Sequence, residues 1–290
     1  MHHEIINYPE KPNVSLECFI LDSGLKLGQS MLRPAVVICP GGGYVYLSPR
    51  EGEPVAMAYA NHGIHAFILR YSVGYEAAGF SPLKEIDWAI GLIRERAQEW
   101  NIDPDKILTC GFSAGGHLAL ASGLLGGNKP NGMILGYPAT NIGKDRIVTS
   151  FLAGKNAEAG DELPWMNLPL QISKEAPPMF AFSTGDDTLT KSRVLELADI
   201  YEEQGLQYEI HIFGKGPHGY SLANTAAADG SSQVLNPHVA KWLNLSVEWI
   251  FDTFGHPVHE DVSTSHIMQA LQDMGIDLTA LVEQKKLDNA

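Results

Sequence analysis

The chain has 290 residues, of which 44% are hydrophobic and 9% aromatic, and its formal net charge at pH 7 is −14. This length and hydrophobic content fit one large α/β domain with a real core. The negative charge opposes binding to nucleic acid and to anionic membranes, and three scattered cysteines (Cys18, Cys39 and Cys110) are too few for a disulfide framework or a zinc site.

In chain order, the N-terminus lacks the basic and apolar regions of a signal peptide, and no apolar run approaches the ~20 residues that cross a bilayer. We therefore expect a soluble cytoplasmic protein. Short β-rich runs then alternate with longer helical patterns, which predicts a mostly parallel sheet with helices on both faces. The predicted strands are 16–21, 35–39, 65–71, 107–111, 133–136, 179–183 and 208–213. The predicted helices are 83–100, 192–204 and 237–251.

A glycine-rich turn follows the predicted strand 35–39, in the run Cys39-Pro40-Gly41-Gly42-Gly43-Tyr44. Consecutive glycines can aim backbone N–H groups into a small concavity, which is how an oxyanion hole is built. The turn lacks both the Gly-Lys-Ser/Thr of a P-loop and the Gly-x-Gly-x-x-Gly of a dinucleotide site. We therefore interpret it as an oxyanion loop in preference to a phosphate loop or a merely flexible turn.

The pentapeptide Gly111-Phe112-Ser113-Ala114-Gly115 follows the predicted strand 107–111 and precedes a helix-favouring stretch. Strand, sharp turn and helix form the context of a nucleophile elbow, where the flanking glycines allow strand and helix to approach closely. A serine there lies at a helix N-terminus, where the helix dipole favours developing negative charge. Ser113 is the predicted nucleophile.

The segment 140–176, which we call the cap segment, interrupts the alternation of strands and helices. It has no clear period and carries Trp165, Met166 and three prolines. A long irregular connection inside a compact domain is usually functional, so this segment is predicted to act as a lid or cap.

A serine nucleophile needs a base and a group that orients the base, and in α/β-hydrolases the chain order is nucleophile, acid, histidine. Asp186 and Asp187 follow the predicted strand 179–183, and His218 follows the predicted strand 208–213 in a turn rich in glycine and proline. His218 is the predicted base. The spacing alone leaves both aspartates open as the acid.

The tail after residue 254 is predicted to be a separate helical extension of the domain 1–254. It carries two short amphipathic patterns, broken at Gly275, and Asp277 is a plausible N-cap for the second pattern. Short helices of this kind are marginal alone and must pack on something, either the body of the chain or a second subunit in a homo-oligomer. His256, His259 and Glu260 lack the helical spacing of a zinc site, so no metal is expected there.

These motifs together resemble the esterase/lipase branch of the α/β-hydrolases, and within it members related to acetyl esterases and acetylxylan esterases. The resemblance rests on the runs at 39–44 and 111–119, the turn at 186–187 and Pro-His-Gly-Tyr at 217–220. It covers residues 34–250 and implies the α/β-hydrolase fold. The chain departs from many relatives by carrying Pro40 in place of a histidine, and a threonine and leucine after Asp187 in place of proline and valine.

The resemblance implies a serine carboxylesterase for short, chiefly acetyl, esters, with sugar esters as candidates and no cofactor. It assigns Ser113 as nucleophile, Asp187 as acid and His218 as base. Gly42, Gly43 and Ala114 match the oxyanion positions. One alternative function is a serine peptidase of the prolyl-oligopeptidase type, but the 290 residues leave no room for the large extra domain that such peptidases carry. The other alternative is a non-catalytic binding protein of the same fold, in which the nucleophile or the histidine is usually lost.

Four further side chains lie in or near these motifs. Tyr44 adjoins the oxyanion loop and Trp165 lies in the cap segment, and both are candidate substrate contacts, Tyr44 before Trp165. Tyr71 is a further candidate, and for all three aromatic residues the alternative is packing in the core. His117 lies one helical turn beyond Ser113 on the same face and is expected to form hydrogen bonds between helix and loop.

Overall fold

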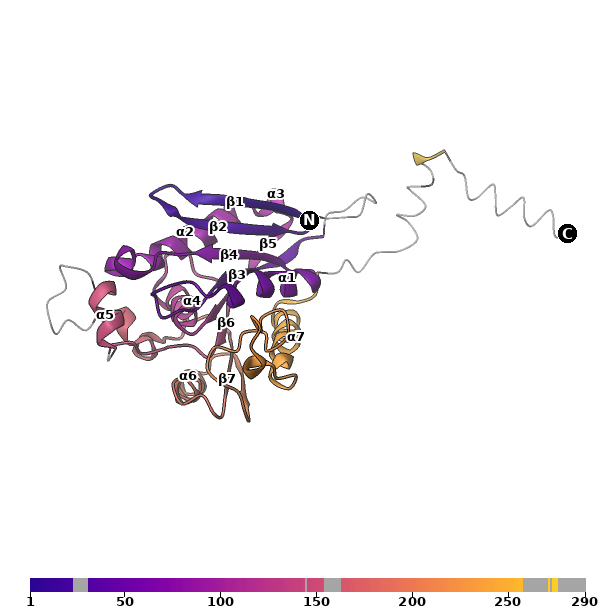
Figure 1. The fold of residues 1–290 in the computed structure, drawn as a ribbon. Helices are drawn as coiled ribbons and strands as arrows, with labels where there is room; N and C mark the ends of the chain where they lie inside the picture. The colour runs from indigo at the N-terminus through magenta and orange to yellow at the C-terminus, as the bar shows by residue number, and fades with distance from the viewer. Residues whose placement is uncertain (23–30, 144, 154–162, 258–270, 272, 276–290) are drawn as a thin grey trace.

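The computed structural model describes residues 1–22, 31–143, 145–153, 163–257, 271 and 273–275 (Figure 1). One sheet of eight strands has the order β1-β2-β4-β3-β5-β6-β7-β8. The pairs β1–β2 and β2–β4 are antiparallel, and the neighbours from β4 to β8 are parallel. The strands are β1 (His2–Tyr8), β2 (Lys11–Ile20), β3 (Arg33–Cys39), β4 (His65–Arg70), β5 (Ile102–Phe112), β6 (Gly132–Gly136), β7 (Met179–Thr184) and β8 (Tyr208–Phe213).

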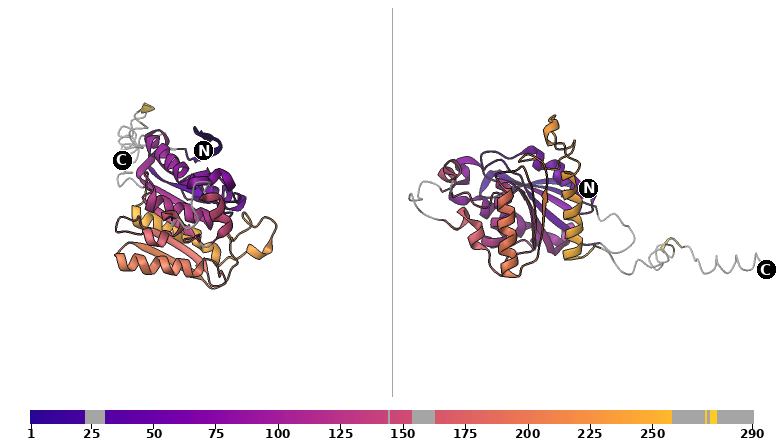
Figure 2. Two further views of the ribbon diagram at one scale, coloured as in Figure 1. Left: turned by 90° about the vertical axis from the view of Figure 1, so that its left-hand side faces the viewer. Right: turned by 90° about the horizontal axis from the view of Figure 1, so that it is seen from below.

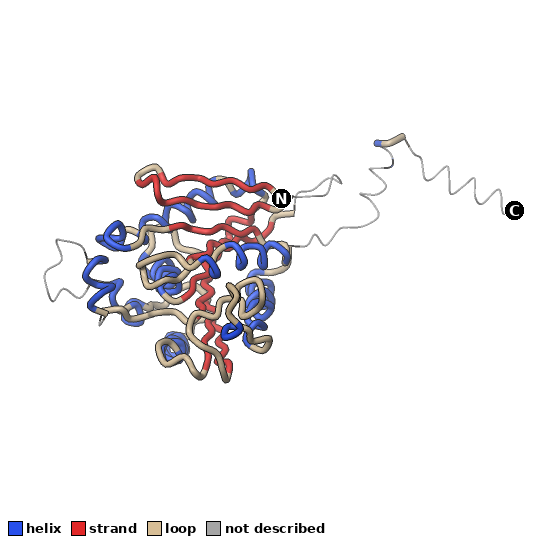
Figure 3. Tube along the Cα trace, viewed as in Figure 1, coloured by secondary structure: helices blue, strands red, loops and turns tan. Residues whose placement is uncertain are grey.

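Helices connect the parallel strands, as a right-twisted parallel sheet requires. They are α1 (Glu53–Asn61), α2 (Pro82–Glu95), α3 (Ala97–Trp100), α4 (Ala114–Leu125), α5 (Arg146–Leu152), α6 (Lys191–Gln204) and α7 (Trp242–Phe254). Short 3-10 helices occupy Pro49–Glu51, Gly74–Phe80, Pro164–Met166, Leu168–Gln171, Ser232–Val234 and Val239–Lys241. Figure 3 shows the twist of the sheet, whose strands turn strongly from β1 and β2 toward β7.

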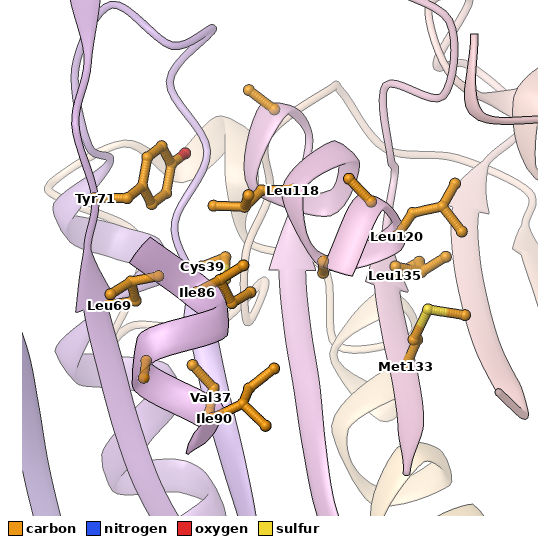
Figure 4. Packing of buried hydrophobic residues seen from close by; sticks show 14 of the residues in the cluster. Val37, Cys39, Leu69, Tyr71, Ile86, Ile90, Leu118, Leu120, Met133 and Leu135 are labelled. Atoms are coloured by element: carbon orange, nitrogen blue, oxygen red, sulfur yellow. The ribbon is translucent and has the colours of Figure 1, made fainter. Parts of the chain in front are cut away.

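The sheet has a hydrophobic core on each face. On one face, α2, α4 and α6 pack on the strands, and Figure 4 shows Ile86 and Ile90 of α2 and Leu118 of α4 among the strand side chains. On the other face, α1 and α7 form the second core, with Trp242 fully buried. Figure 2 (right) shows α6 and α7 on opposite sides of the strands. Parallel strands covered on both faces explain the continuous apolar runs in the sequence.

The predicted fold class and all seven predicted strands are confirmed, with ends that differ by a few residues. The strand β1 was missed, because this edge strand is mostly polar and exposed, with Ile5 exposed and only Glu4 and Ile6 half-buried before the buried Tyr8. The predicted helix 83–100 is divided by Arg96 into α2 and α3, and the predicted helix 237–251 begins as a 3-10 turn before α7. Helix α1 was not predicted.

The described residues of the cap segment form α5 and the two 3-10 helices at Pro164–Met166 and Leu168–Gln171, with irregular backbone between the two 3-10 helices, and the predicted lid or cap role stays a prediction. The two amphipathic patterns of the tail, including Asp277, lie almost wholly outside the described residues. The predicted role of the tail as an interface therefore stays a prediction. In the part of the chain that the structure describes, no helix has the length and apolar character needed to cross a membrane.

Candidate active site

Ser113 lies between β5 and α4 in a strained backbone conformation, with φ 52° and ψ −115°. Such strain in a non-glycine residue persists only where the surroundings hold it. The Ser113 N–H donates to the carbonyl of Gly136 at 3.0 Å, and the Ser113 carbonyl accepts from Ala139 N–H at 3.0 Å. The end of β6 therefore fixes the turn that presents this hydroxyl.

The flanking glycines of the elbow are required by close backbone approach. A Cβ at Gly111 would collide with the carbonyl of Gly115, and a Cβ at Gly115 would collide with the carbonyls of Cys39 and Pro40. The oxyanion loop thus crosses directly against the start of α4, which explains the Gly-x-Ser-x-Gly pattern in this chain.

The loops after β7 and β8 bring His218 between Ser113 and Asp187. Nε2 of His218 lies 2.9 Å from Oγ of Ser113, and Nδ1 lies 2.8 Å from Oδ2 of Asp187. The hydroxyl of Thr184 donates to the carbonyl of Gly216 at 2.7 Å and ties the two loops together. The three side chains therefore meet, although Ser113 and His218 are far apart in the sequence.

Asp187 and Asp186 differ sharply in their surroundings. Asp187 is 2% exposed and accepts hydrogen bonds from Leu189 N–H at 2.9 Å, from the Thr190 hydroxyl at 2.6 Å and from His218. Burial raises the pKa of Asp187, but the hydrogen bonds from His218 and Thr190 outweigh it and leave the pKa below its ordinary value. Asp186 is exposed, and of the two aspartates only Asp187 contacts His218.

An ionised Asp187 fixes the tautomer of His218. A carboxylate can only accept, so the proton of the neutral imidazole lies on Nδ1. Nε2 then carries a lone pair and accepts the hydroxyl proton of Ser113. This arrangement can withdraw a proton from the serine as its oxygen attacks an electrophile.

The glycine-rich loop passes over Ser113. A Cβ at Gly41 would lie 3.2 Å from Cβ of Ser113, and Gly42 and Gly43 adopt positive φ angles of 127° and 64°. Among the described residues, no acceptor bonds the backbone N–H of Gly42, Gly43 or Ala114. These donors lie on the two segments that meet at the serine, and they are available to a developing oxyanion.

Tyr44 and Trp165 lie in one buried aromatic cluster beside the elbow, together with Phe80 and His117. Trp165 stacks on Phe80 with ring centroids 5.0 Å apart, and Tyr44 is fully buried. The imidazole of His117 accepts from the Tyr44 hydroxyl at Nδ1 (2.8 Å) and donates from Nε2 to the Trp165 carbonyl at 2.7 Å. His117 thus forms the predicted hydrogen bonds between helix and loops, and it joins the oxyanion loop to the cap segment.

Tyr71 also borders this cluster, and its hydroxyl donates to the carbonyl of Pro40. Of the three tail residues weighed as a metal site, His256 stacks on Phe251, whereas His259 and Glu260 lie outside the described residues. Sequence analysis missed Glu51 and Tyr137, which are buried beneath the site. Their signal is weak, since Glu51 stands in an ordinary polar turn and Tyr137 follows β6 without a motif.

Comparison with known proteins places these features in a family. The BD-FAE family profile matches residues 21–142. The chain is 31% identical over 221 residues to endo-1,4-beta-xylanase B of Butyrivibrio fibrisolvens, which covers 69% of this chain and 34% of that protein. It is 28% identical over 201 residues to an acetylxylan esterase of Xylanibacter ruminicola, covering 65% of this chain and 41% of that protein. The chain therefore spans well under half of the length of both relatives.

A solved structure matches over nearly its whole length. It is an α/β hydrolase enzyme from a Medee basin deep-sea metagenome library, 32% identical, with a TM-score of 0.76. The match covers 88% of this chain and 99% of that structure. The similarity therefore extends over most of the chain and places it among the α/β hydrolases.

Proposed function

Because the chain belongs to the α/β-hydrolase family, we propose that it is a serine carboxylesterase that hydrolyses short acyl esters. The observation that carries the proposal is the position of His218, hydrogen-bonded at 2.9 Å to Ser113 and at 2.8 Å to a buried Asp187. The strained φ of Ser113 supports it, because stored backbone strain is typical of functional positions.

In the proposed reaction, Ser113 Oγ attacks the ester carbonyl while His218 Nε2 takes the hydroxyl proton. Asp187 stabilises the imidazolium that forms. The N–H groups of Gly42, Gly43 and Ala114 bind the oxyanion, each worth about 3 kcal/mol of transition-state stabilisation.

The alcohol then leaves with the proton returned by His218, which yields an acyl-Ser113 intermediate. Water attacks this acyl group with His218 as base, and collapse of the second tetrahedral intermediate releases the carboxylic acid and regenerates Ser113. The described side chains suffice for both half-reactions, so the proposal invokes neither metal nor cofactor.

Acetyl esters of sugars are the proposed substrate class. The relative from Xylanibacter ruminicola is named an acetylxylan esterase, which supports an acetylated carbohydrate. The buried cluster of Tyr44, Phe80 and Trp165 supports a short acyl chain, because these bulky rings pack around His117, one helical turn beyond Ser113, and limit the space on that side of the elbow. Tyr44 acts indirectly in this proposal, since its hydroxyl is bonded to His117.

The test is steady-state hydrolysis of p-nitrophenyl acetate, butyrate and octanoate by wild type, Ser113→Ala and Ser122→Ala. Ser122 is a matched control, a buried serine of the same helix whose hydroxyl bonds only a helix carbonyl. We expect rates that fall steeply with chain length, vanish in Ser113→Ala and persist in Ser122→Ala. Wild type inert on all three esters, or Ser113→Ala as active as wild type, would favour a peptidase or a binding protein.

A second assay addresses the alcohol. Acetate release from acetylated xylo-oligosaccharides is compared with hydrolysis of p-nitrophenyl acetate at matched concentrations. A kcat/KM for the sugar ester at or above that for the aryl ester supports the sugar proposal. Turnover of the aryl ester alone would remove sugars from it and leave the esterase.

A further inference from the structure

Glu51 is a buried carboxylate directly beneath the oxyanion loop. It is 3% exposed; its Oε2 accepts the N–H of Gly41 at 2.8 Å and its Oε1 accepts the hydroxyl of Tyr137 at 2.6 Å. Within the described residues, no cationic side chain forms an ion pair with Glu51, whereas the other deeply buried glutamate, Glu85, pairs with Lys11 at 2.9 Å. A buried acid held by neutral donors needs a reason to be there.

The two hydrogen bonds of Glu51 begin two arms of one network. The first arm is the bond to Gly41 of the oxyanion loop, and the second arm runs through Tyr137 to the loop that carries His218. The hydroxyl of Tyr137 accepts the N–H of Ser221 at 2.9 Å, and the ring of Tyr137 lies edge-on to His218 with centroids 5.1 Å apart. Ser221 has a positive φ of 50°, and its hydroxyl donates to the carbonyl of Arg50 at 2.6 Å. Arg50, which precedes Glu51 in the chain, thus also holds the strained backbone at Ser221.

The directions of these hydrogen bonds follow from the donors. Backbone N–H groups only donate, and Tyr137 has a single hydroxyl proton. Because the Tyr137 oxygen receives the N–H of Ser221, its own proton points to Glu51. Glu51 therefore accepts in both bonds, as a carboxylate does. Burial raises the pKa of Glu51, and the hydrogen bonds from Tyr137, Gly41 and Ser48, together with the charge of Arg50, offset part of that rise.

We propose that Glu51 is a positioning residue for the proposed ester hydrolysis, on which this inference rests. Through Gly41 it holds the oxyanion loop over Ser113, and through Tyr137 it holds the loop of His218. One side chain thereby sets the oxyanion donors and the base relative to each other. Catalysis depends on such placement, because an oxyanion donor displaced by a fraction of an ångström loses much of its effect.

Two substitutions separate the arms. In Glu51→Gln, the amide has one accepting oxygen, and its NH₂ group faces a donor, so one of the two bonds is lost. In Tyr137→Phe, the bond to Gly41 and the ring against His218 remain, while the link to Ser221 disappears. Glu85→Gln is the matched control, since Glu85 is fully buried and also accepts a backbone N–H, that of Ser72, at 2.7 Å.

The experiment measures kcat and KM for p-nitrophenyl acetate, with the melting temperature of each variant as a folding control. We expect Glu51→Gln to lower kcat by roughly 10²-fold and Tyr137→Phe by roughly tenfold, with KM changed less than about threefold. Glu85→Gln is expected to lower the melting temperature and to leave kcat within about threefold. The loss of kcat in the double variant should be smaller than the product of the two single losses, because both substitutions affect one network and their effects are not additive.

Folded Glu51→Gln and Tyr137→Phe proteins with wild-type kcat would overturn the inference, and so would a loss of kcat in Glu85→Gln equal to that in Glu51→Gln. If Glu51→Gln does not fold, Tyr137→Phe decides alone. The failure of the proposed function looks different: wild type itself would lack Ser113-dependent hydrolysis and would not react at Ser113 with a p-nitrophenyl phosphonate, and both proposals would then fall.

Discussion

The elbow around Ser113 and the cap segment border the same site but are held in opposite ways. Ser113 is tied to the sheet through its backbone, by Gly136 and Ala139 at 3.0 Å each. The cap segment bonds mainly to itself, as in Ile142 N–H to the Met166 carbonyl at 2.9 Å. Its links to the body pass through side chains, such as His117 to the Trp165 carbonyl and Tyr75 against Phe151.

This difference separates two tasks. Backbone ties to a central sheet fix the positions of reacting atoms and change little with side-chain identity. A segment that packs through side chains can be altered without moving those atoms, so it suits selection among substrates. Substitutions on the elbow side should therefore affect turnover or the free energy of unfolding. Substitutions on the cap side should affect substrate preference or the pH dependence of that free energy.

The largest effect is expected at the orienting carboxylate. Asp187→Asn removes the charge that stabilises the imidazolium and favours the wrong tautomer of His218, so kcat should fall by about 10³–10⁴-fold. Asp186→Asn, at an exposed position, should change kcat by less than about threefold. Steady-state kinetics on p-nitrophenyl acetate measures both. A larger loss in Asp186→Asn than in Asp187→Asn would reverse the acid assignment.

The second prediction concerns the close contact between α4 and the oxyanion loop. Gly115→Ala places a Cβ against the carbonyls of Cys39 and Pro40, whose backbone cannot yield cheaply, and should cost about 3 kcal/mol or more of unfolding free energy. A Cβ in the neighbouring Gly116→Ala would lie 2.9 Å from Cβ and 3.0 Å from Cα of Pro138, a milder overlap than the 2.0 Å at Gly115, so this substitution should cost less. Urea denaturation compares the two, and equal losses would contradict a special role for Gly115.

Sequence reasoning reached the strands and the chain order of nucleophile, acid and histidine because these signals are local. The strand Tyr208–Phe213 was predicted with its exact bounds from its own short β-rich run. Asp186 and Asp187 are equivalent by spacing, and only folding buries one of them and exposes the other. Glu51 and Tyr137 are distant in sequence, and their bond depends on how β6 and the oxyanion loop lie side by side. Such a contact leaves no periodic pattern in the sequence.

The third prediction uses the hydrogen-bonded histidine between the two regions. Burial lowers the pKa of His117 to about 4, so the folded chain resists its protonation. The unfolded chain takes up that proton near pH 6.5, so stability is full above this pH and falls as pH decreases toward 4. The loss at about pH 4 is on the order of 3 kcal/mol for this residue.

His117→Gln tests this origin of acid sensitivity. Glutamine can accept from Tyr44 and donate to the Trp165 carbonyl without titrating. The difference in unfolding free energy between about pH 7.5 and about pH 4 should shrink in this variant. It should not vanish, because the pKa of buried His65 is also lowered to about 4. His2→Gln, at an exposed position of β1, is the control, and an unchanged pH difference in His117→Gln would contradict the prediction.

The smallest effect is expected in the cap segment itself. Trp165→Ala removes the ring that stacks on Phe80 and leaves the backbone carbonyl that accepts from His117. The space opened in the aromatic cluster should admit longer acyl chains, because each methylene accommodated in a hydrophobic pocket is worth about 1–3 kcal/mol. The ratio of kcat/KM for octanoate to that for acetate should rise roughly tenfold, with kcat/KM for acetate itself changed less than about threefold.

The control is Leu170→Ala in the same segment, whose side chain is 73% exposed, and it should leave this ratio unchanged. A fall in acetate turnover as large as that of Asp187→Asn would mean that the cap segment positions the reacting groups, and the separation of tasks would fail.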